Sequence, residues 1–426
     1  MTKRIAIIGS GISGLTSAHL LSKEYDVTVF EANDYIGGHT ATKNVEVEGR
    51  QYAIDTGFIV YNDWTYPNFI KLMDTLGIES QKTEMSFSVR NLRSGLEYNG
   101  NTINTLFAQR RNLLSPSFWR LVLDILKFNK VCKQALKDKI DTDNITLIEF
   151  IHQHKLSEQF IQNYILPMCA AIWSTSLEAS ANFPLSFFLK FFNNHGLLNV
   201  TNRPQWHTLI GGSSTYIKPL TADFSDRIRL SCPVSSVKKS LAGYEIETTE
   251  QSEHFDEVIF ACHSDQALAM LELTSFDNAY SAALQNVLEA IPYAMNEVVM
   301  HTDTSVLPKR NLAWASWNYS ISGNSEQAAA PAAVTYNMNI LQRIESDTTF
   351  CVTLNNTESI DPSKVLGTYY YAHPQFSPAM VSAQKRRDEI CGVDGLHFCG
   401  AYWYNGFHED GVRSALDVCK RFGASL

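Results

Sequence analysis

The stretch that decides the fold is Ile5-Ala6-Ile7-Ile8-Gly9-Ser10-Gly11-Ile12-Ser13-Gly14. Its first four residues form a continuous apolar run, which is typical of a parallel strand buried on both faces. A helical segment follows, and then a second apolar run, Val27–Phe30, that ends at Glu31. A strand, a glycine turn, a helix, a strand and an acid in this order predict a dinucleotide-binding unit.

Each residue of the turn has its own physical task in such a unit. Gly9 allows the tight turn, Gly11 lets the backbone approach a pyrophosphate, and Gly14 lets the helix pack closely on the strand. The first helical turn, which includes Ser13, presents amide N–H groups to the phosphates. Glu31 is expected to accept hydrogen bonds from a ribose hydroxyl. A glycine turn without a ligand is the alternative, but the flanking strand, helix and acid favour the cofactor site.

Length and composition exclude several other classes of protein. The chain has 426 residues, of which 45% are hydrophobic and 19% charged, so it can bury a large core and is not expected to be disordered. Its formal net charge is −9 and it has no long Lys/Arg run, which argues against a nucleic-acid partner. No apolar stretch reaches about 18 residues, so no membrane span is predicted.

The cysteines and histidines do not indicate a metal or a redox pair. The eight cysteines are scattered with no C-x-x-C pair, which is typical of reduced thiols in an intracellular protein. The first apolar run is too short for a signal peptide, so we expect a cytoplasmic protein. His152 and His154 are two apart and would point to different faces of a helix, and no H-E-x-x-H is present. A single nucleotide fingerprint argues against bound NAD(P)H.

A second glycine pair separates FAD from NAD. The segment Gly37-Gly38-His39-Thr40 resembles the double-glycine motif of FAD proteins in the amine oxidase and phytoene desaturase superfamily. In that family an arginine usually follows the pair and contacts the pyrophosphate, whereas this chain has His39. Asp55-Thr56-Gly57-Phe58 resembles the family segment that passes close to the flavin ring. The resemblance implies non-covalent FAD, with Gly37, Gly38, His39, Thr40, Gly57 and Phe58 in contact with it.

The C-terminal region offers an independent match to the same family. Residues 395–400 are predicted to form a short buried strand that ends at Gly400, and residues 406–415 open a helix. This resembles the closing motif of the family, although the acid that often follows the glycine is replaced by Ala401. A helix N-terminus stabilises the negative charge of a reduced flavin. The resemblance implies cofactor contacts from Gly400, Gly406, Phe407, His408 and Glu409.

A middle segment completes the predicted cofactor domain. Residues 206–214 resemble the Gly-Gly-Ser turn of the family, Val234 matches a valine at the adenine end, and residues 255–261 resemble a strand that returns to the domain. The resemblance implies an α/β fold of the amine oxidase type, with a Rossmann-like FAD-binding domain assembled from discontinuous segments and an α+β substrate domain. The predicted ranges are 1–74, 201–269 and 386–426 for the FAD-binding domain, and 75–200 and 270–385 for the substrate domain.

The two insertions have different predicted structures. The first reads as helical, with a start signal at Ser115-Pro116 and apolar residues at helical spacing after it. The second reads as strands, at 296–302, 312–319, 331–339 and 349–354, with a loop at 322–330.

A closer resemblance concerns the substrate. Residues 166–174, 55–62 and 406–411 together look like a bacterial subfamily of predicted NAD/FAD-binding, amine-oxidase-like proteins. These are similar to flavoenzymes associated with cyclopropane or methyl-branched fatty-acid modification. The resemblance implies an oxidoreductase whose flavin takes a hydride from an apolar, fatty-acyl-type substrate.

Aromatic clusters supply the candidate substrate and catalytic residues. Phe183, Phe187, Phe188, Phe191 and Phe192 form either a helix core, an apolar substrate tunnel or a patch that dips into a membrane surface. The acidic balance predicts that any peripheral membrane contact is mainly hydrophobic. The candidate substrate contacts are Phe187, Phe188 and Trp206, and the candidate catalytic residues are Tyr402, Trp403 and His408.

Two other functions stay open at this point. One is a flavin-containing amine oxidase, in which Tyr402, Trp403 and Trp206 would form an aromatic cage around the amine. The other is a non-catalytic flavin-binding partner of a lipid-modifying enzyme. For Tyr402 and Trp403 ordinary packing is the alternative role, and for His408 it is a structural hydrogen bond. The expected partners are a small-molecule or lipid substrate and no nucleic acid, and the sequence specifies no oligomeric state.

Overall fold

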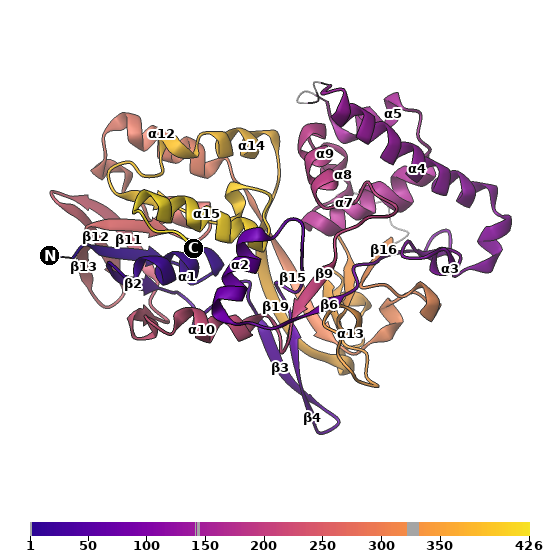
Figure 1. Ribbon diagram of the computed structural model, residues 1–426, viewed down its shortest axis with the longest axis horizontal. Coiled ribbons are helices and arrows are strands. Elements are labelled where there is room, and N and C mark those ends of the chain that lie inside the picture. Colours follow the sequence, from indigo (N-terminus) through magenta and orange to yellow (C-terminus); the bar gives the residue numbers. More distant parts are fainter. Residues whose placement is uncertain (1, 141, 143–144, 322–331) are drawn as a thin grey trace.

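The computed structural model describes residues 2–140, 142, 145–321 and 332–426 of the chain. Figure 1 shows two adjoining parts. One carries both termini and is a sheet covered by helices. The other has a helical layer above and a large sheet below, and a long hairpin projects from its lower edge.

A five-stranded parallel sheet forms the centre of the first part. Its middle strand is β1 (Arg4–Ile8), in which Ile5, Ala6 and Ile7 are fully buried. All its pairings are parallel, so the apolar run predicted as a doubly buried parallel strand is confirmed. The strand order is β10 (Ile228–Arg229), β2 (Asp26–Phe30), β1, β14 (Glu257–Phe260) and β20 (Leu396–Phe398).

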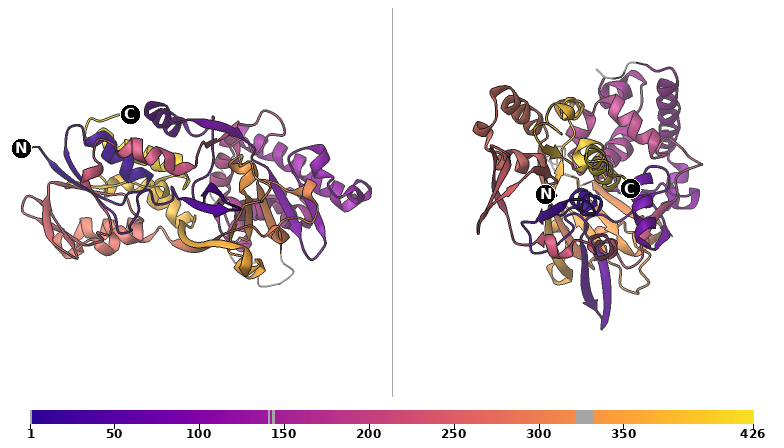
Figure 2. Two further views of the ribbon diagram at one scale, coloured as in Figure 1. Left: turned by 90° about the horizontal axis from the view of Figure 1, so that it is seen from below. Right: turned by 60° about the vertical axis from the view of Figure 1, so that its left-hand side comes forward.

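These strands come from distant parts of the chain, as predicted. Figure 2 shows the N-terminal and C-terminal segments side by side in this part of the molecule. Helix α15 (His408–Arg421) packs on α1 (Ile12–Leu21) so closely that a Cβ on Gly411 would lie 2.6 Å from Ile12 Cγ2. A smaller antiparallel sheet completes the part, with strands β11 (Val234–Ser240), β12 (Gly243–Thr248) and β13 (Ser252–Phe255).

Further helices border the parallel sheet. They are α2 (Pro67–Leu76), α10 (Ile217–Thr221), α11 (Ser264–Met270), α12 (Asn278–Glu289) and α14 (Pro378–Lys385). Leu284 of α12 and Met380 of α14 are fully buried in the same core as β1, although both helices fall within the range predicted for the substrate domain.

A seven-stranded sheet unites the two insertions. Its order is β19 (Val365–Pro374), β15 (Tyr293–His301), β18 (Cys351–Leu354), β17 (Val334–Asn337), β16 (Trp317–Ile321), β7 (Phe87–Asn91) and β8 (Leu96–Asn99). The pairing of β16 with β7 is parallel, and the other pairings are antiparallel. Strands β7 and β8 come from the first insertion and the others from the second.

The predicted strands of the second insertion correspond to β15, β16, β17 and β18. The strand expected from residue 312 begins only at Trp317, because Asn311–Ala313 forms a short 3-10 turn. The loop predicted at 322–330 lies outside the described residues.

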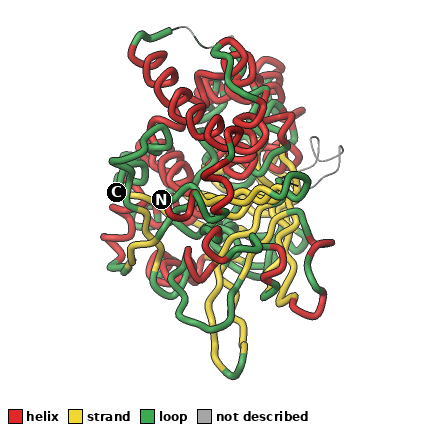
Figure 3. The backbone as a smooth tube through the Cα atoms, turned by 90° about the vertical axis from the view of Figure 1, so that its right-hand side faces the viewer, coloured by secondary structure: helices red, strands yellow, loops and turns green. Residues whose placement is uncertain are grey.

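The first insertion is mainly helical, as predicted. Its longest helix is α4 (Pro116–Lys137), which begins where the start signal placed it because the Ser115 hydroxyl accepts a hydrogen bond from Phe118 N–H. Figure 3 shows these helices gathered above the strands. The others are α3 (Ile103–Leu106), α5 (Leu147–Gln153), α6 (Glu158–Phe160), α7 (Leu166–Trp173), α8 (Leu177–Ala181) and α9 (Leu185–Asn194).

Short elements join the two parts. They are the hairpin β3 (Thr42–Val47) and β4 (Arg50–Asp55), the strands β5 (Tyr61–Asn62), β6 (Ser80–Thr83) and β9 (Trp206–Leu209), and helix α13 (Met338–Leu341). Strand β9 lies between β5 and β6 and so ties the middle segment to the N-terminal third of the chain.

Candidate active site

The glycine turn after β1 is tight on one side and open on the other. Gly9 has φ 109°, and its N–H donates to Phe30 O over 2.8 Å. A Cβ on Gly14 would lie 2.0 Å from Gly9 O, so helix and turn are in direct contact there. A Cβ on Gly11 would meet nothing within 4 Å. The open face therefore lies at Gly11, beside Ser13 in the first turn of α1, where a pyrophosphate would approach.

Glu31 at the end of β2 has two sets of partners. One carboxylate oxygen accepts hydrogen bonds from the N–H and hydroxyl of Ser10, at 2.9 and 2.6 Å, and the other accepts from Asn33. The side chain therefore shapes the glycine turn, and both of its oxygens have protein partners. Cys232 N–H donates to Glu31 O, so Val234, two residues further along, lies near the same end of the sheet.

The second glycine pair meets the first. Gly37 and Gly38 have φ 120° and 58°, and Gly37 forms a parallel bridge with Gly11. A Cβ on Gly37 would lie 2.6 Å from Ile217 Cδ1. The two glycine motifs therefore lie side by side, and Gly37 leaves no room for a side chain where they meet.

His39 lies in a cluster of histidines that no sequence motif indicates. Its ring centroid is 5.3 Å from that of His373 and 6.3 Å from that of His263. Its Nε2 is buried and has no partner among the described residues. Burial and the neighbouring histidines hold the pKa of His39 well below its usual range, and burial lowers the pKa of His373 to about 4. A buried nitrogen without a protein partner fits a ligand at this place.

The Asp55–Phe58 segment packs against the second glycine pair. Phe58 N–H donates to His39 O over 2.8 Å, and a Cβ on Gly57 would lie 2.2 Å from that oxygen. The buried Asp55 accepts hydrogen bonds from Ser213 N–H and from the Thr42 hydroxyl. Burial raises the pKa of Asp55 to about 6. Asp55 thus joins the hairpin to the middle Gly-Gly-Ser turn.

His408, predicted at the flavin, is held by a chain of hydrogen bonds. Its Nε2 lies 2.8 Å from the hydroxyl of Tyr216, which also bonds the Thr40 hydroxyl. Its ring is stacked on Phe58. Burial lowers the pKa of His408 to about 3, so the ring is neutral at physiological pH. Tyr216 was missed from sequence, since a tyrosine six residues after Trp206–Ile210 carries no motif of its own.

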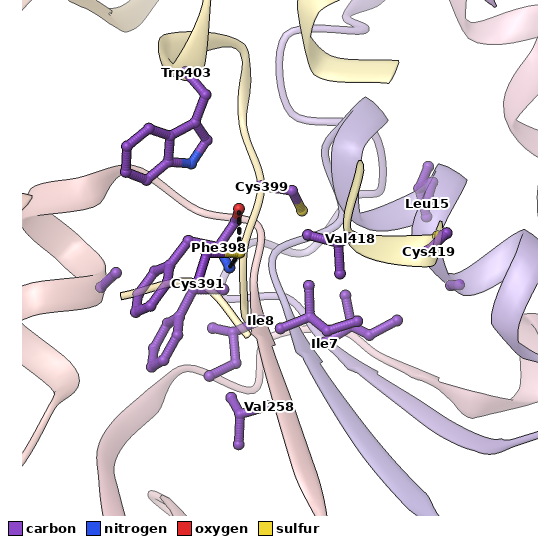
Figure 4. Close-up of a cluster of buried hydrophobic side chains, with 14 of the residues drawn as sticks. Ile7, Ile8, Leu15, Val258, Cys391, Phe398, Cys399, Trp403, Val418 and Cys419 are labelled. Carbon is purple, nitrogen blue, oxygen red and sulfur yellow. Dashed lines mark hydrogen bonds between the residues drawn. The ribbon is translucent and has the colours of Figure 1, made fainter. Parts of the chain in front are cut away.

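Tyr402 and Trp403 do not lie on an open face. Each is only 3% exposed and packs in the core of the parallel sheet. The Arg387 guanidinium covers the Trp403 ring at 5.3 Å, and Figure 4 shows Trp403 and Cys399 on opposite sides of the backbone after β20. The Tyr402 ring also fills the space that a Cβ on Gly400 would take. A sandwich in front of a flavin needs exposed ring faces, so this packing favours the alternative that both are core residues.

The N-terminus of α15 is arranged as the closing motif predicts. Gly406 has φ 88°, and Phe407 N–H donates to the Asp410 carboxylate over 2.9 Å. Burial raises the pKa of Asp410 to about 7. The Glu409 carboxylate points away, to Asn68 and to Phe69 N–H at the start of α2. A cofactor contact from Glu409 would therefore come from its backbone and not from its side chain.

The phenylalanine cluster divides into two groups. Phe188 and Phe192 are buried among helices, with the Phe188 ring 4.0 Å from Phe192 and 5.8 Å from Phe128 of α4. Phe188 is therefore a core residue and not a substrate contact, which corrects that assignment. Phe187 and Phe191 instead reach the cofactor-side segments, and their contacts are Phe187 with Phe376 at 4.8 Å and Phe191 with Phe407 at 5.2 Å.

Trp206 is half-buried in β9 and packs against the core of the seven-stranded sheet. A cavity of about 380 Å³ opens beside the first turn of α15. Its lining is mixed: Asn68, Asn194, His195, Glu409 and Arg413 are polar, whereas Trp64, Tyr66 and Phe407 are aromatic. The cavity therefore offers an alkyl chain only part of an apolar wall, because its charged and amide side chains keep their own water.

Neither a metal centre nor a membrane span is found among the described residues. In that part of the chain, no group of three or more His, Cys, Asp or Glu side chains could hold a metal ion. Nor does any described helix have the length and apolar character that crossing a membrane demands.

Comparisons with known proteins place this geometry in a family. The family model for flavin containing amine oxidoreductase matches residues 12–339. Amine oxidase [flavin-containing] A from Sus scrofa is 28% identical over 256 residues, which are 57% of this chain and 46% of that protein. The protein of the same name from Bos taurus is 26% identical over 253 residues, with the same coverage. The chain thus spans about half the length of the curated relatives it matches.

Solved structures confirm the fold. Cyclohexylamine oxidase from Brevibacterium oxydans IH-35A superposes with a TM-score of 0.69 at 14% identity, over 99% of this chain and 100% of that one. The CLA-producing fatty acid isomerase from P. acnes gives 0.68 at 14% identity, over 99% and 98%. These structures confirm the predicted amine oxidase fold, and the family model confirms the flavin cofactor. The narrower bacterial subfamily is not confirmed. The chain belongs to the family of flavin-containing amine oxidoreductases.

Proposed function

We propose that this protein is an FAD-dependent oxidoreductase that acts on an apolar, fatty-acyl-type substrate. When bound, FAD supplies the hydride acceptor. The residues of the chain contribute binding, orientation and the exclusion of water around the reacting carbon. We assign the pyrophosphate to Gly9, Gly11, Ser13, Gly14, Gly37, Gly38 and His39, the ribose to Glu31, the adenine end to Val234, and the flavin end to Thr40, Gly57, Phe58, Gly400, Gly406, Phe407 and His408.

One observation carries the substrate proposal. Phe187 and Phe191 of α9 stack on Phe376 and Phe407, with interplanar angles of 22° and 25°. Phe407 directly precedes His408, so an aromatic layer connects the helical insertion to the predicted flavin end. An alkyl chain in such a layer gains about 0.8 kcal/mol for each CH₂ that it buries. A small charged amine would lose its hydration in this layer. The carboxylates that share a cavity with Phe407, those of Glu409 and Asp410, already accept hydrogen bonds from backbone N–H groups.

His408 is proposed as a positioning residue and not as an acid or base. Its neutral ring is fixed by Tyr216 on one side and Phe58 on the other. A group with both constraints holds neighbouring segments in place, and its low pKa makes proton uptake unfavourable.

The alternative of an amine oxidase is supported by the curated relatives. Those from Sus scrofa and Bos taurus are amine oxidases, although the match covers 46% of their length, and a shorter match, 32% identical over 79 residues, is to a carotenoid phi-ring synthase. The structural neighbours include both an amine oxidase and a fatty acid isomerase at the same identity, so they favour neither substrate. The buried positions of Tyr402 and Trp403 leave Trp206 as the remaining member of the predicted cage.

Anaerobic flavin reduction distinguishes these functions. We expect bleaching by acyl substrates to strengthen as the alkyl chain lengthens. Phe187→Ala should reduce this chain-length dependence. Phe188→Ala serves as the matched control: it should lower stability by about 3–5 kcal/mol but leave the dependence unchanged in the folded fraction. Reduction by short amines, with no effect of chain length, would leave the amine oxidase in front, and no reduction by either class would favour a non-catalytic flavin protein.

A further inference from the structure

The outer face of the first insertion exposes an unusual group of large apolar side chains. The exposed fractions are 88% for Leu114, 58% for Leu123, 48% for Leu126, 47% for Leu113 and 43% for Trp119. Leu113 and Leu114 lie in the 3-10 turn Arg110–Leu114 just before α4, and the other three lie on α4. We call these five residues the α4 face. A soluble monomer scatters its exposed apolar residues singly, so a group gathered in one short stretch marks an interaction surface.

The residues that pack α4 onto the hydrophobic core lie on the opposite side of the helix from this face. The opposite side of α4 is already packed, with Phe118, Leu121 and Phe128 at most 3% exposed. Trp119, Leu123 and Leu126 are three or four residues apart and therefore lie along one side of the helix. In Figure 1 the helix runs along the outer edge of the molecule, far from both termini, and Figure 3 shows its layer from that side.

The side of α4 that carries Trp119, Leu123 and Leu126 becomes basic toward the end of the helix. Lys130, Lys133 and Lys137 continue the spacing of Leu126. Within the described residues no carboxylate oxygen lies within 4.0 Å of these three lysines. Residues 110–137 carry seven Lys or Arg side chains and one Asp, a local charge of +6 in a chain of net charge −9.

We propose that the α4 face docks on the surface of an anionic lipid bilayer. Apolar side chains, with a tryptophan among them, insert at the boundary of headgroups and acyl chains, while a basic rim meets the anionic headgroups. The two features coincide here. The acidic charge of the whole chain predicts a mainly hydrophobic membrane contact. Electrostatic attraction acts over only about 10 Å, however, so the local positive charge of this region determines its attraction to anionic lipid.

Only a layer of helices lies between the α4 face and the predicted flavin end. Phe128 on the inner side of α4 contacts Phe188 of α9, and Phe191 of α9 contacts Phe407 beside the flavin end. A single packed helix layer thus separates the bilayer surface from that region. The docking goes beyond the proposed function, since vesicle binding does not depend on which substrate is oxidised.

The test is cosedimentation of the full-length, FAD-loaded protein with lipid vesicles. We expect binding to phosphatidylcholine vesicles that contain about 30 mol % phosphatidylglycerol, and little binding to phosphatidylcholine alone. The bound fraction should fall as salt rises from about 0.05 M to about 0.5 M. Two double variants should each weaken binding at least about tenfold. One combines Leu123→Asp with Leu126→Asp, and the other combines Lys130→Gln with Lys133→Gln.

Matched controls lie on the far hairpin of the first part. Leu241→Asp changes a leucine that is fully exposed in the β11–β12 turn, and Lys238→Gln changes an exposed lysine beside it. Neither should alter vesicle binding. Equal binding to neutral vesicles, or binding that survives the α4 substitutions, overturns the proposal. So does a concentration-dependent dimer, seen by sedimentation velocity, that the leucine substitutions abolish, because the face would then join two copies of the chain.

Discussion

The imidazole ring of His408 lies flat against the phenyl ring of Phe58, with centroids 3.8 Å apart and planes 8° from parallel. These residues are 350 positions apart in the chain, and each belongs to a segment expected at the flavin ring. Their contact fixes the start of α15 against the segment that follows β4. The neutral state of His408 suits this contact, since a buried imidazolium would have no acidic partner in the hydrogen-bonded chain to Tyr216 and Thr40.

Removing the Tyr216 hydroxyl should loosen this contact. In Tyr216→Phe both His408 Nε2 and the Thr40 hydroxyl lose a buried partner, so the free energy of unfolding should fall by about 1–3 kcal/mol. Denaturant titration of the FAD-loaded protein measures the change. Tyr244→Phe is the control, because its hydroxyl bonds Asp394 O far from the site. It should lower stability without altering flavin fluorescence, whereas Tyr216→Phe should alter both.

Substitutions in the glycine turn should separate cofactor loss from misfolding. Gly11 has φ −67° and ψ 176°, an extended conformation that valine adopts, and open space beside its Cα. Gly11→Val should therefore fold but retain no FAD. Glu31→Ala should weaken FAD binding by about 1–3 kcal/mol, or about 5- to 150-fold. The flavin-to-protein absorbance ratio after gel filtration reports both, and a Gly11→Val protein with full flavin would place the cofactor elsewhere.

FAD should be held without a covalent bond. Cys399 is the cysteine nearest the strand-end glycine, and its Sγ lies 3.9 Å from the Ser17 hydroxyl inside the domain. Burial raises the pKa of its thiol to about 12, so it is a weak nucleophile. Acid precipitation should release yellow FAD into the supernatant. Flavin that remains in the pellet would show a covalent attachment.

Stability should fall in mild acid through His301, which lies away from the cofactor site. Its Nδ1 accepts a hydrogen bond from Asp303 N–H, and Nε2 bonds the Thr353 hydroxyl. Burial lowers the folded-state pKa of His301 to about 4, against about 6.5 in the unfolded chain. The unfolded state then binds more protons between these values, so stability decreases as pH falls from about 6.5 to about 4, by up to about 1.4 kcal/mol per pH unit.

The variant His301→Gln provides the measurement. It removes the titrating group and keeps polar atoms that can bond Thr353, so its stability should fall less steeply with acid than that of the natural protein. The comparison is the difference in unfolding free energy between pH 7 and pH 5. The buried carboxyls of Asp55 and Asp410 have raised pKa values and act in the opposite direction, but they act equally in both proteins. Identical slopes would contradict the assignment.

The parts of the fold that sequence predicts are those with local patterns. Local sequence patterns predict the buried strand β1, the serine cap of α4 and the glycine turns, because each has a physical cause within a few residues. The three clustered histidines are His39 after the second glycine pair, His263 before α11 and His373 near the end of β19, so only the tertiary fold brings them together. The same holds for Tyr216.

The sequence also does not predict the direction in which some side chains point. Phe187 and Phe188 are neighbours in sequence, yet α9 turns one toward Phe376 and the other into the helix core. Tyr402 and Trp403 were expected to face the flavin because of their position between two motifs. Their direction depends on the turn after Gly400, and that turn sends them into the core.

The parallel pairing of β16 with β7 has a consequence for how this protein can change. Each insertion supplies only some strands of the seven-stranded sheet. Without the other insertion, the edge of β7 or of β16 that now lies at the junction would be unpaired. Replacing one insertion by that of a distant relative would leave backbone N–H and C=O groups unpaired along the seam. The two insertions therefore form one exchangeable cassette despite the 69 residues between their predicted ranges, and chimeric proteins should transfer both together.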